Sequence, residues 1–338
     1  MSVRQFLKER NIEFSLRRYG VDMINYMTWG LFGSLIIGLI IKTIGQWLHL
    51  EYLIEVGTVA QAGMGAAIGV GVAYGLQAPP MAIFTAPIIG QLAVTVGGGP
   101  VGCLVAAIVS SELAKVVHRK KATDIIFVPA VSLIVGLAVA YTVAPLLGDM
   151  MRTIGSTIEW AMQLQPLFMS MLLAVIVGMV LTSPTSSAAL TISLELSGLA
   201  AGAATAGCCA QMIGFAAMSY KENGWPGLLG IGLGTSMLQL PNIIKNPFIW
   251  VPPILTAAIL GPVATMGFDM RNVPAGAGMG SSGLVGQVGT IEAMGNTTEV
   301  LIAIALVQFI FPALLALIFT HLLRKLKLIK AGDLTLPK

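Results

Sequence analysis

Charged residues are what this 338-residue sequence most lacks. Asp, Glu, Lys and Arg make up 10% of the chain and hydrophobic residues 56%, whereas charged residues form roughly 25% of an ordinary soluble domain. So few charges exclude a water-soluble globule. Apolar runs of about 20 residues, the length that crosses a hydrocarbon layer, recur between positions 23 and 321. They do not alternate in strand-length pieces as a membrane barrel requires. The sequence therefore predicts an all-α polytopic membrane protein.

Cysteine and histidine are also scarce, with three residues of each. The cysteines lie inside apolar segments without a CxxC spacing, which is typical of buried, inert thiols: Cys103, Cys208 and Cys209. The histidines lie at the ends of apolar runs and match no metal-ligand spacing: His49, His118 and His321. No Walker loop, zinc motif or nucleophile–base pair is found. We expect neither a metal nor a cofactor, and an enzymatic role is disfavoured.

Basic residues gather in three places: before the first apolar run, in the middle of the chain, and after the last run. The strongest members are Arg4, Lys8, Arg10, Arg17, Arg18, Lys115, Arg119, Lys120, Lys121, Arg324, Lys325, Lys327 and Lys330. The positive-inside rule places all three groups, and hence both termini, in the cytoplasm. Because these residues flank apolar runs and form no basic face, nucleic acid is not expected as a partner.

About ten membrane crossings satisfy this arrangement. The predicted spans are 23–45, 57–76, 81–97, 100–117, 125–147, 166–182, 188–219, 225–241, 248–267 and 299–323. Residues 1–22 have the spacing of an amphipathic helix on the inner membrane surface. Residues 148–165 have a similar composition and are interpreted as an amphipathic linker, with a plain external loop as the alternative. The predicted parts are therefore 1–147, the linker, and 166–330.

The segment 268–298 is too polar and glycine-rich for an ordinary span and too apolar for a solvated loop. A re-entrant hairpin fits, because irregular backbone at membrane depth must be satisfied by protein or by a wet cavity; an external loop is the alternative. Thr290 and Asn296 supply polar groups there. An ionised Glu292 should face a cavity, a solute or a partner, unless the hairpin lies at the interface and Glu292 is hydrated. Glu299 is expected at a helix N-terminus, where the dipole favours a carboxylate.

The stretch 239–253 contains four prolines, which cannot belong to one regular helix. The carbonyl groups that these prolines free need hydrogen-bond donors, and Asn242 and Asn246 can provide them. Together with Gln239, the same amides lie beside aromatic residues, an arrangement that suits a hydroxyl-rich ligand. Both interpretations remain open.

Three further polar features lie in apolar surroundings. Glu195, eight residues into the predicted span 188–219, is expected to be buried and is a candidate proton or cation site, unless it pairs with a backbone donor. The hydroxyl-rich run 182–187 indicates a helix start, at which capping is preferred over anion binding. Gln211 is expected to join helices rather than to bind a ligand.

Several motifs resemble the membrane subunit IIC of bacterial phosphoenolpyruvate-dependent sugar phosphotransferase systems, in particular the stand-alone branch that includes PfoR-type regulators. The run Gly289-Thr-Ile-Glu292 is similar to the Gly-Ile-Thr-Glu motif of the glucose-type superfamily. Asn246-Pro-Phe, followed by Val251-Pro252, is similar to its Asn-Pro and Pro-Phe signature. The run 123–129 resembles the cytoplasmic entry to the fifth helix of that family.

The resemblance implies ten crossings, an amphipathic linker and re-entrant hairpins. It further implies a homodimer formed through 1–147 and an elevator-like movement of the sugar-binding half, 166–330. The glucose-type site also contains a histidine, which the second half of this chain lacks in its core. Without IIA or IIB domains, the chain would need a separate IIB protein at the cytoplasmic face for phosphoryl transfer.

These observations predict a transporter of the IIC type in the bacterial plasma membrane, binding a sugar or a sugar-like solute. The predicted substrate-binding residues are Glu292, Thr290, Asn296, Asn242, Asn246, Gln239 and Glu195. A membrane-embedded ligand sensor of the PfoR type and an ion-coupled permease independent of phosphorylation are the alternatives.

Overall fold

The computed structural model describes residues 3–119 and 121–336, and within these ranges the protein is helical, without a β-strand. The chain divides into two units, Met1–Thr153 and Ile154–Lys338. The division falls inside α9 (Ala144–Leu164) and within the segment 148–165 that the sequence predicted as a linker. The roles assigned to the two halves stay predictions.

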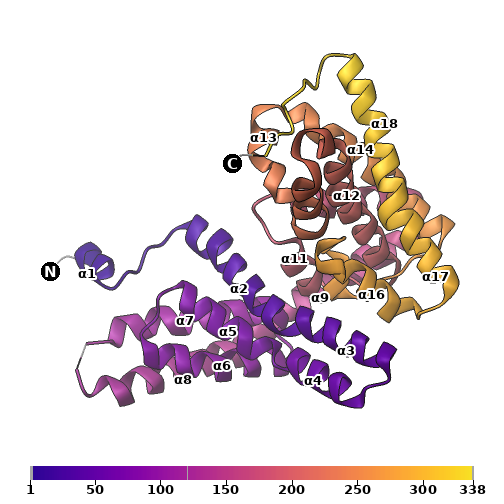
Figure 1. The fold of residues 1–338 in the computed structure, drawn as a ribbon. Helices are drawn as coiled ribbons and strands as arrows, with labels where there is room; N and C mark the ends of the chain where they lie inside the picture. The colour runs from indigo at the N-terminus through magenta and orange to yellow at the C-terminus, as the bar shows by residue number, and fades with distance from the viewer. Residues whose placement is uncertain (1–2, 120, 337–338) are drawn as a thin grey trace. The chain divides into compact units, whose positions relative to one another are not determined.

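Unit 1 is an array of helices that runs into the first part of α9. It contains α1 (Val3–Glu9), α2 (Met23–Leu31), α3 (Ile37–Leu48), α4 (Glu51–Ala62), α5 (Met64–Gly75), α6 (Pro80–Thr95), α7 (Gly99–Val117) and α8 (Asp124–Thr142) (Figure 1). The helices α2 and α3 belong to one continuous helical stretch, Arg17–Leu48, and α4 and α5 are bent by 50° at a short break. Helix α3 packs on α4, α5 on α6, and α7 on α8.

The amphipathic helix predicted over 1–22 is shorter than expected. Residues 1–2 lie outside the described residues, and α1 ends at Glu9. The chain then turns at Asn11, which has a φ of 53°. The Asn11 amide donates to Gln77 Oε1 at 2.6 Å, and its carbonyl accepts from Lys115 Nζ at 3.1 Å. These bonds to distant segments favour a turn over a continued helix.

Glycines allow the helices of unit 1 to approach closely. A Cβ atom placed on Gly69 of α5 would meet the Ala86 carbonyl of α6, and one placed on Gly65 would lie 2.6 Å from the Gly90 carbonyl oxygen. Small residues are favoured at such contacts because lipid provides no hydrophobic force between helices, so association depends on close packing. The glycine-rich composition is thus used for helix packing.

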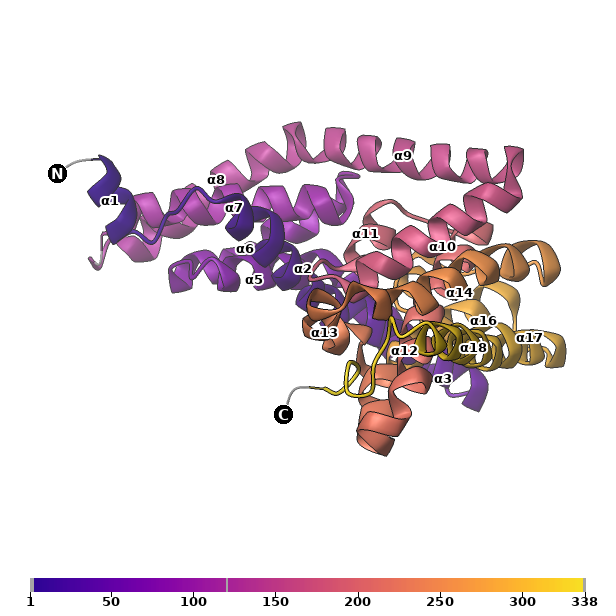
Figure 2. The same ribbon diagram turned by 90° about the horizontal axis from the view of Figure 1, so that it is seen from above.

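Unit 2 is built around α12 (Gly198–Leu229), which packs against α10, α14 and α18 (Figures 1 and 2). Its other helices are α10 (Pro166–Thr182), α11 (Ser187–Ser193), α13 (Leu240–Lys245), α14 (Val251–Pro262), α15 (Pro274–Ala277), α16 (Val285–Met294), α17 (Thr298–Ala303) and α18 (Phe311–Lys325). Within the helical stretch Gly198–Gly234, 89% of the most apolar 18-residue segment is buried inside the protein. Non-helical dihedral angles at Gly224 kink α12 near its end.

Short helical turns connect the longer helices of unit 2. They are η3 (Gly230–Gly234), η4 (Ser236–Gln239), η5 (Pro247–Trp250), η6 (Val263–Gly267), η7 (Ser282–Leu284) and η8 (Ile304–Ile310). The proline-rich stretch 239–253 therefore forms several short pieces, as its prolines require. Asn246 caps η5 by accepting from Phe248 N at 3.1 Å, and Ser186 caps α11 by accepting from Ala189 N at 3.1 Å.

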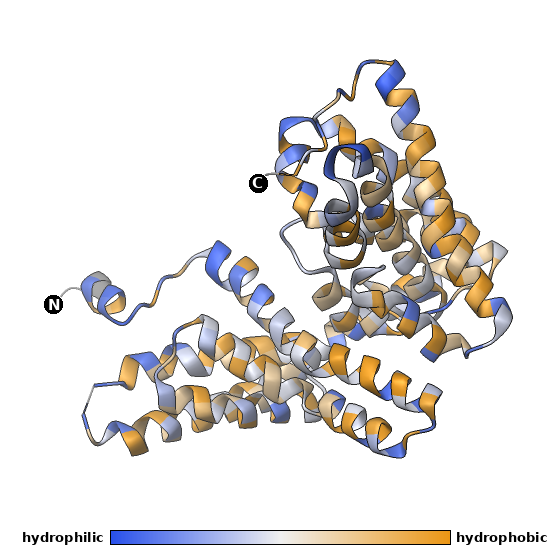
Figure 3. Ribbon diagram, viewed as in Figure 1, coloured by the Kyte–Doolittle hydropathy of each residue, from blue (hydrophilic) through white to orange (hydrophobic). Residues whose placement is uncertain are grey.

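The helices have the length and composition of an integral membrane protein. Among the described residues, six helices can cross a membrane, or seven if the bent pair α4–α5 is one span, and α6 and α10 are shorter apolar helices. Figure 3 shows hydrophobic residues along α3, α4 and α18. The predicted count of ten crossings is not confirmed, and the predicted span 188–219 is interrupted between α11 and α12. The orientation of the termini stays a prediction.

The segment predicted as a re-entrant hairpin forms a helical hairpin made of α15 and α16. Its two ends meet, because Arg271 N lies 3.2 Å from Met294 Sδ. Its tip contacts η3, where Ser281 Oγ donates to the Gly232 carbonyl. Three residues at the tip have positive φ angles: Gly280, Gly283 and Leu284. The chain thus enters and leaves at one end of the hairpin; its depth in the membrane stays a prediction.

Candidate functional site

A buried polar network ties the α15–α16 hairpin to the rest of unit 2. Asn272 Nδ2, just before α15, lies 2.7 Å from Thr205 Oγ1, 2.9 Å from the Gly286 carbonyl oxygen and 3.2 Å from Thr290 Oγ1. Thr290 Oγ1 also accepts from Gln308 Nε2 of η8 at 2.9 Å. Asn272, Thr290 and Gln308 are each 1% exposed. Four separate elements therefore place polar groups at one point inside the unit.

Glu292 and Asn296 lie toward the open end of the hairpin rather than in this network. Glu292 is half-buried in the last turn of α16, and Asn296 is exposed in the following turn. Asp269 and Arg271 lie on the other side of the hairpin entrance, where the chain leads into α15. They form an exposed ion pair with an N–O distance of 3.0 Å. Of the residues predicted in this segment, Thr290 is therefore in the interior, whereas Glu292 and Asn296 lie near the open end of the hairpin.

Three glutamines of unit 2 keep a buried amide atom without a hydrogen-bond partner among the described residues. The atoms are Gln211 Nε2, Gln287 Oε1 and Gln308 Oε1. Gln287 lies one turn before Thr290 on α16, and its Nε2 is 3.6 Å from Cys209 Sγ. A buried polar group without a partner costs about 1–3 kcal/mol. Donors and acceptors of a bound solute would offset that cost.

A second polar cluster forms where three short segments meet α12. Gln211 Oε1 accepts from Trp250 Nε1 at 3.0 Å and from Thr182 Oγ1 at 3.2 Å. Thr182, the last residue of α10, is also 2.8 Å from Ser236 Oγ of η4. The sequence indicated Gln211 as a residue that joins helices, which it does. The participation of Ser236 had no signal in the sequence, because its partners come from distant segments.

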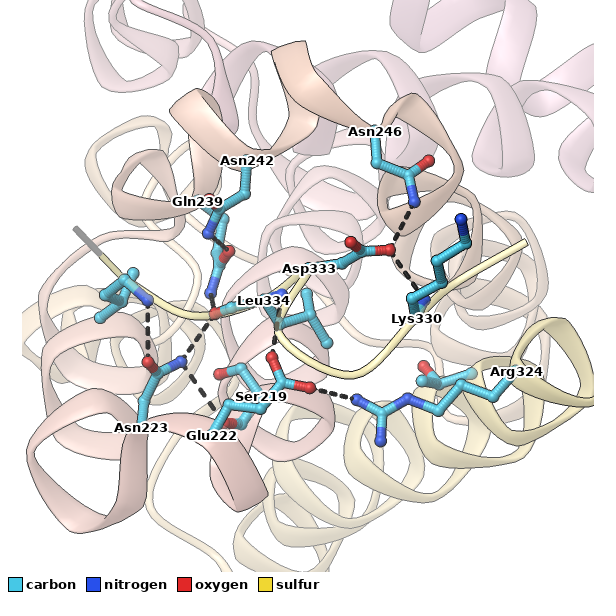
Figure 4. Close-up of polar contacts among 12 residues, drawn as sticks. Ser219, Glu222, Asn223, Gln239, Asn242, Asn246, Arg324, Lys330, Asp333 and Leu334 are labelled. Carbon is cyan, nitrogen blue, oxygen red and sulfur yellow. Dashed lines mark hydrogen bonds and ion pairs between the residues drawn. The ribbon is translucent and has the colours of Figure 1, made fainter. Parts of the chain in front are cut away.

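The predicted residues of the proline-rich stretch bind the C-terminal tail, defined here as residues 326–336. Figure 4 shows their amides directed toward this segment. Gln239 Nε2 donates to the Leu334 carbonyl at 2.9 Å, and Asn242 Nδ2 donates to the Thr335 carbonyl at 2.9 Å. Asn246 Nδ2 donates to the Leu328 carbonyl at 3.0 Å. Their side chains therefore bind backbone carbonyls of the protein itself.

The end of α12 holds the other side of the same tail. Asn223 Nδ2 donates to the Leu334 carbonyl at 2.8 Å, and Asn223 Oδ1 accepts from Leu336 N at 2.8 Å. Glu222 accepts from Leu334 N at 2.9 Å and pairs with Arg324 of α18 at 2.7 Å (Figure 4). The sequence analysis did not single out Glu222 or Asn223, because nothing in their neighbourhood indicates that a segment about 110 residues away binds there.

The structure thus divides the predicted site residues into groups. Gln239, Asn242 and Asn246 gather at α13, whereas Thr290, Glu292 and Asn296 belong to α16 and the turn after it. Figures 1 and 2 both show α13 and α16 at different ends of unit 2. The fold therefore does not bring all of these residues together in a single site.

Glu195 does not lie where the sequence placed it. The prediction of a buried carboxylate is wrong, since Glu195 is exposed. It has a φ of 51° and lies in the connection between α11 and α12. The physical reason is that the chain must reverse direction there. The next residues are fixed by Glu159, whose Oε1 accepts from Ser197 Oγ at 2.7 Å.

Comparison with known proteins gives one clear finding. A search of the curated proteins found no match. The family model described as "Phosphotransferase system, EIIC" matches residues 21–336, which includes most of unit 1 and all of unit 2 except its last two residues. The match confirms the resemblance that the motifs indicated. The chain is therefore a member of the EIIC family, the membrane components of phosphotransferase systems.

Proposed function

We propose that this EIIC protein binds a sugar or a sugar-like solute at the α15–α16 hairpin and carries it across the membrane. The observation that supports this most directly is that two buried glutamines beside Thr290, Gln287 and Gln308, each keep an amide oxygen without a hydrogen-bond partner among the described residues. Sugar hydroxyl groups both donate and accept, so they are suited to amide and hydroxyl side chains. A few convergent polar groups within apolar walls are typical of small-molecule sites.

Each hairpin residue has a role in this proposal. Gln308 would accept a hydrogen bond from a solute hydroxyl through Oε1, and Thr290, which accepts from Gln308 Nε2 at 2.9 Å, would hold the Gln308 amide in position. Glu292, half-buried near the rim, would accept a hydrogen bond from a hydroxyl group, and Asn296 would act at the entrance. Gln239, Asn242 and Asn246 would join the solute only after the tail leaves. Glu195 has no role here because it is exposed.

We further propose that transport is elevator-like, with unit 2 carrying the solute and residues 1–147 forming a homodimer. The family relationship makes the chain a membrane component that works with other phosphotransferase-system proteins. A separate IIB protein would supply the phosphoryl group, since the three histidines, His49, His118 and His321, all lie outside the hairpin. The solute would thus meet the phosphoryl donor at a surface of the membrane.

Solute binding to the purified protein, screened over a panel of sugars and sugar acids, tests this proposal. Thr290→Val and Gln308→Leu should each weaken the affinity by about tenfold or more, equivalent to about 1.4 kcal/mol. Asn25→Ala is the matched control, because Asn25 is an exposed amide of unit 1. Affinities unchanged in Thr290→Val and Glu292→Gln would exclude the hairpin as the site.

A second function is supported by the binding of the tail. Gln239, Asn242 and Asn246, which the sequence assigned to a solute, instead bind residues 326–336. In a ligand sensor, a solute that competes for these amides would change the exposure of the tail. Uptake into proteoliposomes without a phosphodonor, with and without an ion gradient, separates the functions. Binding without uptake would favour the sensor, and gradient-dependent uptake would favour an ion-coupled permease.

A further inference from the structure

The tail, residues 326–336, is held by side chains of other segments and by turns of its own. Its residues form turns and bends without a long helix or strand, and Thr335 N donates to the Gly332 carbonyl at 3.1 Å within it. Four side-chain amides bind its backbone: Asn223, Gln239, Asn242 and Asn246. This pattern is similar to that of a bound peptide, in which main-chain groups give affinity and pockets for a few side chains give specificity.

Two apolar side chains of the tail enter the core of unit 2. Ile329 is 3% exposed and Leu334 is 0% exposed. They belong to one hydrophobic cluster that includes Phe215 of α12, Ile231 of η3 and Ile249 of η5. The tail is therefore anchored at two points, and loss of either anchor would expose apolar side chains of three different elements.

Polar contacts fix the tail between these anchors. Asp333 Oδ2 accepts from Asn246 Nδ2 at 2.7 Å and from Lys330 N at 2.7 Å. The first bond joins the tail to the cap of η5, whose last residue, Trp250, donates to Gln211 in the second polar cluster. Displacement of the tail would thus act directly on the proline-rich segment.

We propose that the tail is a detachable strap: when bound, it fixes the segment from η4 to η5 against α12 and occupies Gln239, Asn242 and Asn246, and when released, it frees these amides. The strap contains few intrinsic helical or strand bonds of its own, so it can leave without unfolding a secondary-structure element. Its effect on solute binding rests on the proposed function, whereas its attachment and release do not.

Hydrogen exchange of the full-length protein tests the attachment. The double variant Asn223→Ala, Asn246→Ala should raise exchange in residues 239–250 and 328–336 by about tenfold or more, because several interlocked hydrogen bonds are lost. The control Asn25→Ala should leave both segments unchanged. If the hydrogen-exchange rates of both segments are the same in the double variant and the wild type, the proposed attachment of the strap is wrong.

A competing peptide tests the release. A labelled peptide with the sequence of residues 328–338 should bind the full-length Leu334→Asp variant at least about tenfold more tightly than the wild type, whose own tail competes for the groove. The buried position of Leu334 makes an aspartate there eject the tail. Adding Asn223→Ala should weaken this peptide binding. No binding to the Leu334→Asp variant, provided that it keeps the wild-type helical content, would contradict the proposal.

The same variants separate the strap from the proposed function. If the strap regulates solute access, the double variant should change solute affinity or uptake at least about threefold, a difference of about 0.65 kcal/mol. Unchanged affinity and uptake would overturn regulation by the strap. If the labelled peptide binds the Leu334→Asp variant but the wild type binds no solute, the strap is supported and the proposed function is contradicted.

Discussion

The two units use the same helix packing but place their polar groups differently. In unit 1, buried hydroxyls such as Thr43 and Ser110 donate to carbonyls of their own helix, Leu39 and Ala107. Unit 2 has hydroxyls of the same kind, such as Thr256, and in addition a buried amide that bonds between elements, as Asn272 does with Thr205 and Thr290. A hydroxyl satisfied by its own helix does not hold two elements together, whereas a bond between elements depends on their positions.

This difference indicates how the two units respond to a change of position. The inter-element contacts of unit 1 are mainly small-residue packing and a network at one end, where Tyr19 Oη donates to Glu112 at 3.1 Å and Lys115 Nζ donates to the Asn11 carbonyl at 3.1 Å. The inter-element contacts of unit 2 include amides that a solute can also satisfy. We therefore expect unit 2 to be the half in which binding and rearrangement are coupled.

Glycine substitutions at close helix contacts should have the largest effect on the free energy of unfolding. We expect this effect to be similar in the two units. Gly69→Val in unit 1 and Gly207→Val in unit 2 would place side chains against the carbonyls of Ala86 and Ala174. We expect each to lower the free energy of unfolding by about 3 kcal/mol, the upper part of the range for overpacked cores. Thermal unfolding in detergent measures it.

The control for these glycines is Gly63→Ala. A Cβ atom at Gly63 has its closest neighbour at 3.5 Å, an ordinary contact, so its stability should stay close to that of the wild type. Equal stability of Gly63→Ala and Gly69→Val would show that close packing is not what holds unit 1 together.

Polar substitutions should separate the units. Asn272→Leu in unit 2 removes the donor shared by Thr205, Gly286 and Thr290 and should cost about 2–3 kcal/mol, since buried acceptors lose their partner. Ser110→Ala in unit 1 should cost less than about 1 kcal/mol, because the Ala107 carbonyl keeps its position in the helix. Chemical denaturation of both variants gives the comparison. If the two variants lose equal free energy of unfolding, buried polar groups do not contribute differently to the stability of the two units.

Gln308→Leu should separate stability from function. The change removes the bond to Thr290 but also a buried amide oxygen without a partner, so the two effects should nearly cancel, within about 1 kcal/mol. Solute affinity should still fall by about tenfold. Calorimetric titration beside thermal unfolding measures both. A large loss of stability with unchanged affinity would assign Gln308 a purely structural role.

The smallest effect is expected on the surface of unit 1. Asp149→Asn removes the ion pair with Arg152, whose N–O distance is 2.6 Å and whose side chains are 40% and 70% exposed. An exposed pair contributes about 0–1 kcal/mol, and the contribution should shrink further in high salt. A loss well above that range in thermal unfolding at two salt concentrations would mean that this pair carries more than a surface contact.

Local features of the sequence were sufficient for the class of protein and for part of the fold. The long apolar runs predict membrane helices, and the motif at Gly289–Glu292 indicates the EIIC family, which the family match confirms. The glycine-rich segment 268–298 predicts a re-entrant hairpin; α15 and α16 pack on each other there, and their entry into the membrane stays a prediction. The prolines of 239–253 predict broken helices. Each of these depends on residues close together in the chain, so periodicity and composition can reveal them.

Only the tertiary structure decided which polar groups meet. Asn242 and Asn246 read equally as a ligand site or as structural donors, and their acceptors are residues more than 80 positions away in the tail. Glu195 lies in a reversal of the chain that hydropathy alone does not show. The physical reason is that a side-chain amide is satisfied by any donor or acceptor at the right distance. The sequence therefore determined the membrane helices and the family, and the fold determined the hydrogen-bond partners.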